Sequence, residues 1–359
     1  MDVLSALEQW SERGDRVALA TVVATKRSAP QPPGTKMAIN DQGEVVGAVS
    51  GGCVEGAVVE LAEEILGGAE PRLVQYGIAD EEAWDVGLPC GGEISIWVQA
   101  YEPDGLPARF TGHGRAGDRA ALVTVVDGEA NLGAKLLVGT GEEVQGTLGD
   151  PRVDEAAIEL ARAGLWSERS ELHERDGVSL FVDVVAPPPR LFIVGAVDFA
   201  AQLCAVARLA GWRAYVIDPR ERFATRERFP AAEQVVASWP QEAFAQLEAI
   251  DRATAIAVLT HDPKLDDAAL TAALASDAGY IGAMGSRRAQ ERRHDRLIEA
   301  GIEPAQLDRI AAPIGLDFGA LSAAETALSI MGEIVAVRHG RSGGRLRDAQ
   351  GRIHEATPA

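Results

Sequence analysis

The second half of the chain alternates between two hydrophobic patterns. Short apolar runs, typical of buried strands, occur at 191–194, 214–217, 233–237, 256–260 and 280–284. Stretches with helical spacing of apolar residues lie near 199–210, 265–275, 286–300 and 322–337. Strands that alternate with helices in this way predict a Rossmann-like parallel α/β domain.

The first half of the chain contains an internal repeat. Its two copies are ALATVVATKRSAPQPPGTKMAINDQGEVVGAVSGGCVEGAVVELAEEIL and ALVTVVDGEANLGAKLLVGTGEEVQGTLGDPRVDEAAIELARAGL, with Gly34 and Lys36 opposite Gly133 and Lys135. A closing strand follows in each copy, GEISIWVQAYEP in the first and GVSLFVDVVAPP in the second. Each copy is predicted to form three strands, a helix and a further strand. One copy would bury its apolar face poorly, so we expect the two copies to form one mixed α/β domain about a pseudo-twofold axis.

Three consecutive prolines, Pro187 to Pro189, separate the two halves, because proline interrupts regular structure and forms stiff linkers. The expected domains are 1–186, with related halves at about 15–103 and 119–188, and 190–338. The tail at 339–359 is polar and glycine-rich, so we expect it to be disordered.

Composition narrows the class of protein. The 359 residues carry a formal net charge of -20, which argues against binding to nucleic acid or to an anionic membrane surface. The chain has no apolar run long enough to span a membrane, and its start, MDVLSALEQWSERG, predicts an amphipathic helix and not a signal peptide. We therefore expect a cytoplasmic protein, whose three cysteines are thiols or ligands and not disulfides.

Two of the three cysteines lie in glycine turns. Cys53 follows Gly51 and Gly52 in VSGGCVEG, at the start of a stretch with helical spacing. Unpaired N–H groups and the helix dipole favour an anion there, so the thiol should ionise more readily than a free one. The two glycines would let a ligand approach the backbone closely, and Ser50 adds a hydroxyl.

Cys90 lies in a second such turn, GLPCGG, beside Gly91 and Gly92. The sister copy has Arg152 opposite Cys53 and Arg175 opposite Cys90, so the shared backbone does not require cysteine at either position. The sequence therefore predicts that the two thiols face one cleft and hold an anionic ligand that binds sulfur. A structural zinc site and a disulfide between the two cysteines remain alternatives.

The Rossmann-like half departs from the dinucleotide fingerprint. Gly195 is its first glycine, but Val197 replaces the second, and Asp198 next to it would repel phosphate. Asp218 ends the second strand where a ribose-binding carboxylate belongs, and Arg220 could favour a 2′-phosphate. An NAD(P)-dependent oxidoreductase is therefore the alternative function.

Further polar residues follow the later strands of this half, at the sheet edge where such folds bind ligands. His261 comes directly after one strand, and Ser286 caps the helix that follows the next. Arg287 and Arg288 lie in the first turn of that helix, where they oppose the helix dipole, so binding of an anionic group explains them better than local stability. Asp317, in a later glycine loop, is a further candidate contact.

Together these motifs resemble the XdhC/CoxI family of molybdenum-enzyme maturation factors, over most of the chain. The resemblance rests on SGGCVEGAVVELAEEIL, GLPCGG, VIDPRERFATRERFP, LTHDPKLDDAAL, YIGAMGSRRAQERR and APIGLDFGALSAAETALSIMGEIVA. The chain departs from the family at RSAPQ, which has Arg27 and Gln31 at its outer positions, and at the Gly195–Asp198 turn. It also lacks the iron–sulfur cysteine pattern and the length of a molybdenum hydroxylase.

The resemblance implies a non-catalytic protein that binds the molybdenum cofactor (molybdopterin), supports its sulfuration, and helps to insert it into a xanthine dehydrogenase-like hydroxylase. It implies the apo-hydroxylase and a cysteine desulfurase as partners, and a homodimer. Cys53 and Cys90 would contact molybdenum or its sulfur, which suits soft thiolate ligands. The residues assigned to cofactor binding are Ser50, Gly51, Gly52, Cys53, Cys90, Gly91, Gly92, Gly195, Asp198, Asp218, His261, Ser286, Arg287, Arg288 and Asp317.

Overall fold

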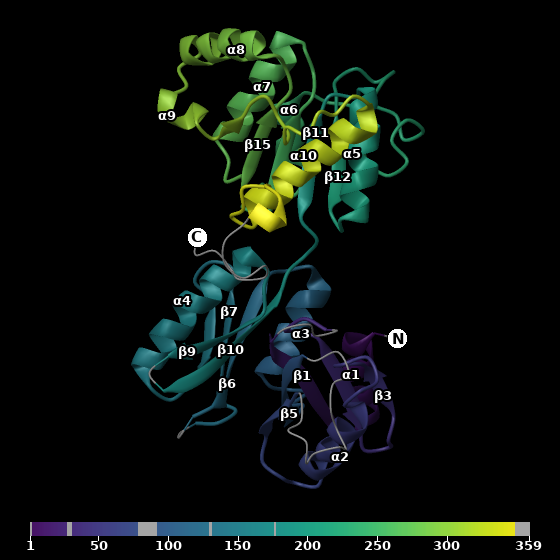
Figure 1. Ribbon diagram of the computed structural model, residues 1–359, viewed down its shortest axis with the longest axis vertical. Coiled ribbons are helices and arrows are strands. Elements are labelled where there is room, and N and C mark those ends of the chain that lie inside the picture. Colours follow the sequence, from purple (N-terminus) through teal and green to yellow (C-terminus); the bar gives the residue numbers. More distant parts are fainter. Residues whose placement is uncertain (1, 27–30, 78–91, 129–130, 176, 349–359) are drawn as a thin grey trace. The chain divides into compact units, whose positions relative to one another are not determined.

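A computed structural model of the chain describes residues 2–26, 31–77, 92–128, 131–175 and 177–348 (Figure 1). The chain divides into two compact units, Met1–Pro187 and Pro188–Ala359. Each unit is considered by itself.

The first half of the N-terminal unit is a five-stranded antiparallel sheet with the order β3-β2-β1-β5-β4. Helix α2 covers one face of this sheet through Val58, Leu61, Ala62 and Ile65, whose helical spacing gives one apolar stripe. The elements of this half are α1 (Val3–Arg13), β1 (Val17–Lys26), β2 (Lys36–Asn40), β3 (Val45–Gly47), α2 (Glu55–Leu66), β4 (Arg72–Tyr76) and β5 (Glu93–Ala100).

The second half repeats this arrangement. Its sheet has the order β8-β7-β6-β10-β9, which is the same order taken five strands later, and α4 covers the corresponding face. The elements are α3 (Leu106–Ala116), β6 (Ala120–Asp127), β7 (Lys135–Gly139), β8 (Val144–Thr147), α4 (Pro151–Ser167), β9 (Glu171–Arg175) and β10 (Val178–Val185). Each half thus contains one strand more than its sequence predicts, which is β4 in the first half and β9 in the second. Each half also begins with a helix.

Matching glycines show that the two copies share one backbone. Gly47 and Gly146 have φ angles of 87° and 91°, which disfavour other residues. A Cβ atom at either position would lie 2.4 or 2.5 Å from the carbonyl oxygen of Lys36 or Lys135 on the neighbouring strand. The strand pair closes this tightly only because glycine occupies both equivalent positions.

The two halves pack through the sheet faces that α2 and α4 leave free. Val23 and Trp97 of the first sheet form one cluster with Val126 and Phe181 of the second. Each half therefore contributes side chains to a cluster that it shares with the other.

The C-terminal unit is built on a six-stranded parallel sheet with the order β13-β12-β11-β14-β15-β16. Helices α5 and α10 lie side by side on one face, and α6, α7 and α8 cover the other (Figure 1). The strands are β11 (Arg190–Val194), β12 (Arg213–Ile217), β13 (Gln234–Val236), β14 (Thr254–Val258), β15 (Tyr280–Ala283) and β16 (Ile310–Ala311). The helices are α5 (Asp198–Leu209), α6 (Pro240–Gln246), α7 (Pro263–Leu274), α8 (Arg287–Glu299), α9 (Pro304–Leu307) and α10 (Ala323–Arg338).

This order, with its reversal between β11 and β14, is that of a Rossmann fold, so the predicted fold class is confirmed. Sequence periodicity missed the short elements α6, α9 and β16. Cys204 is fully buried in the core against α10, and burial raises the pKa of its thiol to about 12. A short 3₁₀ turn, η1 (Leu346–Asp348), lies in the described part of the tail. In the part of the chain that the structure describes, no helix combines the length and apolarity that crossing a membrane requires.

Candidate functional site

The turn that holds Cys53 connects β3 to α2. Helix α2 begins at Glu55 with Val54 as its N-cap, so Cys53 lies two residues before the helix. Its side chain is half-buried and packs against the core beneath α2. Gly51 and Gly52 have φ angles of 81° and 113°, and a Cβ atom at either would meet nothing within 4 Å. Backbone conformation therefore requires these glycines, and the space beside them is open.

The carboxylate of Glu55 fills the centre of this turn. The backbone N–H groups of Ser50, Gly51 and Gly52 donate to it at 2.8–2.9 Å, and those of Val49 and Val54 at 3.2 Å. The Ser50 hydroxyl donates to it at 2.5 Å and accepts from the N–H groups of Cys53 and Val54. The sequence predicts that these N–H groups bind an anionic ligand, but the Glu55 carboxylate of the protein itself already accepts their hydrogen bonds.

Hydrogen bonding dominates the titration of Glu55. Burial raises the pKa of its carboxyl group, but hydrogen bonds from the Ser50 hydroxyl and from backbone N–H groups outweigh burial, so the pKa falls from 4.5 to about 2. Glu55 is therefore charged at neutral pH, and its negative charge offsets the positive end of α2 beside Cys53.

The sister turn before α4 has the same plan with fewer contacts. Asp154, at the position equivalent to Glu55, accepts from the Leu148 N–H and the Thr147 hydroxyl. Arg152, opposite Cys53, is exposed beside Asp150. Only the first copy combines a half-buried thiol with a fully hydrogen-bonded carboxylate.

The second cysteine turn is described only at its end. Cys90 and Gly91 lie outside the described residues, and Gly92 is buried just before β5. A shared cleft for Cys53 and Cys90 therefore stays a prediction, as does a disulfide between them. Among the residues that are described, no group of three or more His, Cys, Asp and Glu side chains is placed to hold a metal ion.

In the C-terminal unit, residues that follow β12 and β14 both contact the turn after β11. Gly195 has a φ angle of 116°, and a Cβ atom there would lie 2.5 Å from the Thr260 side chain, which follows β14. The Ala196 N–H donates to the Asp218 carboxylate at 2.8 Å. The structure therefore brings Gly195 and Asp218 together, as the Rossmann pattern predicts.

Arginine side chains form hydrogen bonds with the polar groups that would otherwise contact a dinucleotide. Asp218 is fully buried and accepts three hydrogen bonds from Arg220, one from its backbone N–H and two from its guanidinium. Arg228 donates to the Ala196 carbonyl and pairs with the exposed Asp198. Because Arg220 and the turn engage both oxygens of Asp218, this conformation does not offer its carboxylate to a ribose, and the NAD(P) alternative loses its main contact.

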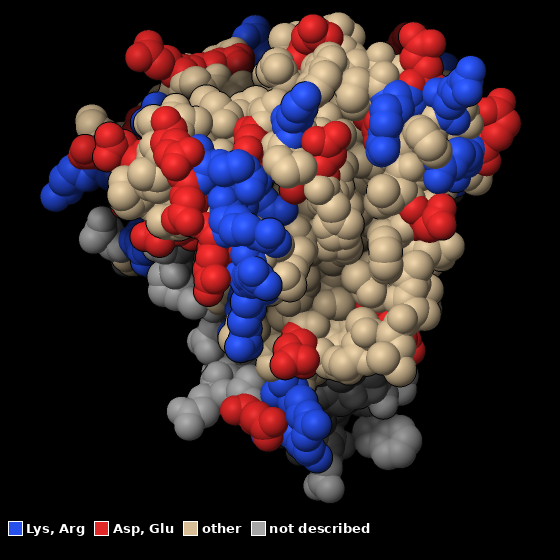
Figure 2. Space-filling model, turned by 90° about the horizontal axis from the view of Figure 1, so that it is seen from above, with Lys and Arg blue, Asp and Glu red and all other residues tan. Residues whose placement is uncertain are grey.

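The remaining predicted residues lie at the carboxyl edge of the same sheet. His261 is exposed after β14, Ser286 caps α8, and Asp317 is exposed in the loop before α10. Arg287 and Arg288 are exposed in the first turn of α8, and neither forms an ion pair with any residue that the structure describes. Helix α8 lies at the top of Figure 1, and the view from above in Figure 2 shows basic side chains in a row, with acidic side chains beside it.

Sequence reading missed a buried ion pair behind these loops. Arg293 of α8 donates to Asp266 of α7 at 2.8 Å, and both side chains are almost fully buried. Asp266 also accepts from the Thr260 hydroxyl, and Arg293 also donates to the Met284 carbonyl. The pair thus fixes the loops after β14 and β15. The only sequence signal was a charged residue on the apolar stripe of each helix.

These features define a class of two-unit proteins. A repeated antiparallel unit with one specialised cysteine turn precedes a Rossmann unit whose dinucleotide turn is altered. Two family models give the particular family. The XdhC Rossmann domain matches residues 191–334, and the XdhC and CoxI family model matches residues 10–77 and 114–175. The chain belongs to the XdhC and CoxI family.

Relatives match almost the whole chain. A probable xanthine dehydrogenase subunit from Bacillus subtilis is 24% identical over 92% of this chain and 96% of its own length. The Escherichia coli "Molybdenum cofactor insertion chaperone PaoD" is 27% identical over 90% of this chain and 84% of its own. A crystal structure from Bacillus halodurans, described as a xanthine dehydrogenase, has the same fold, with a TM-score of 0.63 and 22% identity over 97% of this chain and 98% of that one.

Proposed function

We propose that this protein binds the molybdenum cofactor, supports its sulfuration, and helps to insert it into a molybdenum hydroxylase of the xanthine dehydrogenase type. Its partners would be the apo-hydroxylase and a cysteine desulfurase, and it would act as a cytoplasmic homodimer without catalysing a reaction of its own. Family membership and the name of the Escherichia coli relative, a molybdenum cofactor insertion chaperone, support this proposal.

The observation that carries the proposal is the half-buried Cys53 thiol beside an open double-glycine turn. A thiolate is a soft ligand that suits molybdenum and its sulfur atoms. The cofactor, when bound, would supply the molybdenum centre that the hydroxylase needs. In this proposal Cys53 and Cys90 hold the sulfur side of the cofactor.

The Cys53 turn does not suit an anionic group. Glu55 takes the N–H groups of the Cys53 turn, so a phosphate would meet a carboxylate there. Arg287 and Arg288 at the start of α8 offer exposed guanidinium groups instead, which bind phosphate oxygens well. Within the C-terminal unit taken by itself, these arginines, with Ser286 and His261, are proposed to bind an anionic group such as a phosphate.

The test measures the cofactor retained on purification. We expect the full-length protein, purified from cells that make molybdenum cofactor, to carry pterin and molybdenum, detected by fluorescence after oxidation and by elemental analysis. Cys53→Ser and Cys90→Ser should each lower the retained pterin roughly tenfold or more, since loss of even an outer-shell partner of a metal site typically costs that much. Cys204→Ala removes a thiol from the core and should keep the pterin bound.

Two results would contradict the proposal: wild-type protein without pterin, or equal pterin in wild type and both serine variants. Fluorescence titration with NADH and NADPH addresses the alternative function separately. We expect no binding below millimolar concentrations, because Arg220 already pairs with Asp218.

A further inference from the structure

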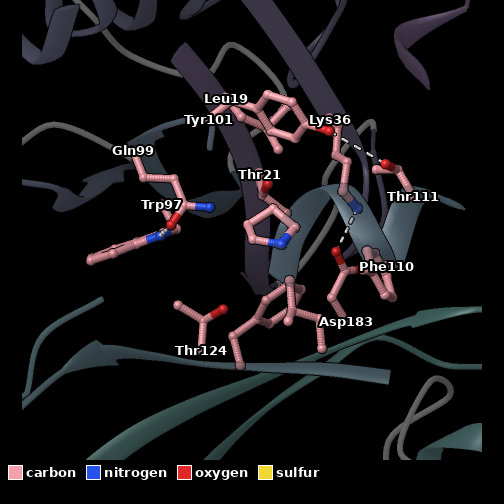
Figure 3. A pocket seen from close by; sticks show the side chains of 13 residues that line it. Leu19, Thr21, Lys36, Trp97, Gln99, Tyr101, Phe110, Thr111, Thr124 and Asp183 are labelled. Atoms are coloured by element: carbon pink, nitrogen blue, oxygen red, sulfur yellow. Dashed lines mark hydrogen bonds and ion pairs between the residues drawn. The ribbon is translucent and has the colours of Figure 1, made fainter. Parts of the chain in front are cut away.

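A small cavity lies between the two sheets of the N-terminal unit, and buried polar groups lie among the mainly apolar side chains that line it. It has a volume of about 20 Å³ and receives side chains from both halves (Figure 3). Its polar lining includes Thr21 and Gln99 from the first half, and Thr124 and Asp183 from the second. Each of these four residues is at least nine-tenths buried.

Residues at equivalent positions of the two repeat copies line the cavity. Thr21 lies opposite Trp97 in the first sheet, and Thr124 lies opposite Phe181 in the second. The two threonines therefore occupy the same place in each copy and approach the cavity from opposite sheets (Figure 3). Both threonines line the cavity, and among the described residues neither hydroxyl makes a hydrogen bond.

One end of the cavity carries an ion pair between the halves. The Lys36 ammonium contacts the Asp183 carboxylate at 2.6 Å and also donates to the Gly34 carbonyl. At the equivalent position of the first copy, Gln99 replaces the carboxylate, and its amide oxygen accepts from the Trp97 indole. The cavity thus has a charged end and a neutral end.

Unpaired polar groups in such a place are costly. A buried hydroxyl without a partner costs about 1–3 kcal/mol, and the cavity contains two. A space of about 10–15 Å³ holds one water molecule, provided that two to four polar groups can bind it. The observed volume accommodates one water and excludes an organic ligand.

We infer that the cavity is a binding site for one ordered water molecule, which bridges Thr21 and Thr124 and links the two halves. Gln99 and Asp183 also line the cavity, one at each end, and add a polar group on either side of this water. This site does not depend on the proposed cofactor function. The water makes the interface between the two halves of the N-terminal unit partly hydrated.

The first test is direct. A high-resolution crystal structure of the full chain should show one peak in the cavity, at hydrogen-bond distance from both threonine hydroxyls. An empty cavity would overturn the inference, and so would a peak with the short contacts of a metal ion.

The second test is a double-mutant cycle read as melting temperature. Thr21→Val and Thr124→Val should each lower the melting temperature by about 2–4 °C, because each leaves the water with one partner fewer. The double variant replaces both hydroxyls by methyl groups of the same shape, so its loss should be smaller than the sum of the two.

Thr25→Val is the matched control, since Thr25 lies on the same strand as Thr21 and does not line the cavity. It should shift the melting temperature less than either single variant. Additive losses in the Thr21 and Thr124 cycle would show that the hydroxyls do not share a water and would overturn the inference.

Discussion

Asp266→Asn should lower the free energy of unfolding of the C-terminal unit by about 3–5 kcal/mol, the typical cost of removing one partner from a buried ion pair. The reason is the position of Arg293, which is 5% exposed and would keep its charge without a counter-ion. Its Nε atom is already buried without a partner, so the guanidinium has little spare hydrogen bonding to compensate. Urea unfolding of the full chain at neutral pH, followed by circular dichroism, measures the loss.

A neighbouring pair on the same two helices provides the control. Asp267 and Arg296 are in contact at 2.6 Å, but their side chains are 27% and 35% exposed. Asp267→Asn should therefore cost about 1 kcal/mol or less, as partly solvated pairs do. Equal losses in the two variants would show that burial does not set the strength of the Asp266–Arg293 pair.

Glu55→Ala is the second large effect that we expect. It removes the acceptor of six hydrogen-bond donors in the Cys53 turn, which should cost about 2 kcal/mol in the N-terminal unit. The vacated N–H groups should then bind an external anion, because they converge where the carboxylate lay. Formate or sulfate should raise the melting temperature of this variant more than that of the wild type.

Asp154→Ala in the sister turn is the matched control. That carboxylate has two donors, so its removal should cost less and should create no comparable anion site. If formate stabilised both variants equally, the special role assigned to Glu55 would be wrong.

The pH dependence of Glu55 has a defined sign. Its pKa is about 2 in the folded protein and 4.5 otherwise, so the carboxylate stabilises the turn fully above pH 4.5. This stabilisation is lost as the pH falls from 4.5 toward 2. The stability difference between wild type and Glu55→Gln should therefore shrink over that window and stay constant between pH 5 and 7.

Periodicity predicted the architecture because burial of whole helix faces and strands dominates it. The repeat and the parallel sheet both follow from such patterns. The extra strands β4 and β9 were missed because their residues are mostly half-buried and form no continuous apolar run.

The contacts within the candidate site were harder to predict because they depend on side-chain conformation. Glu55 in the first turn of α2 is a typical helix-stabilising residue, and its sequence position does not reveal that it folds back over the preceding loop. Asp218 matched the ribose-binding pattern, yet Arg220 two residues later takes its oxygens. Asp266 and Arg293 are 27 residues apart, so only the packing of α7 against α8 brings them together.

The difference between Glu55 and Asp154 is a single methylene group. The longer Glu55 side chain accepts from the N–H groups of Ser50, Gly51 and Gly52, whereas Asp154 accepts from the Leu148 N–H and the Thr147 hydroxyl. The hydrogen bonds of the Glu55 carboxylate stiffen the Cys53 turn. This rigidity offsets the flexibility of the two glycines beside the thiol. The sister turn also has Pro151, which has no N–H, opposite Gly52, and Arg152 opposite Cys53, so the longer side chain is one of several changes that specialise the first copy.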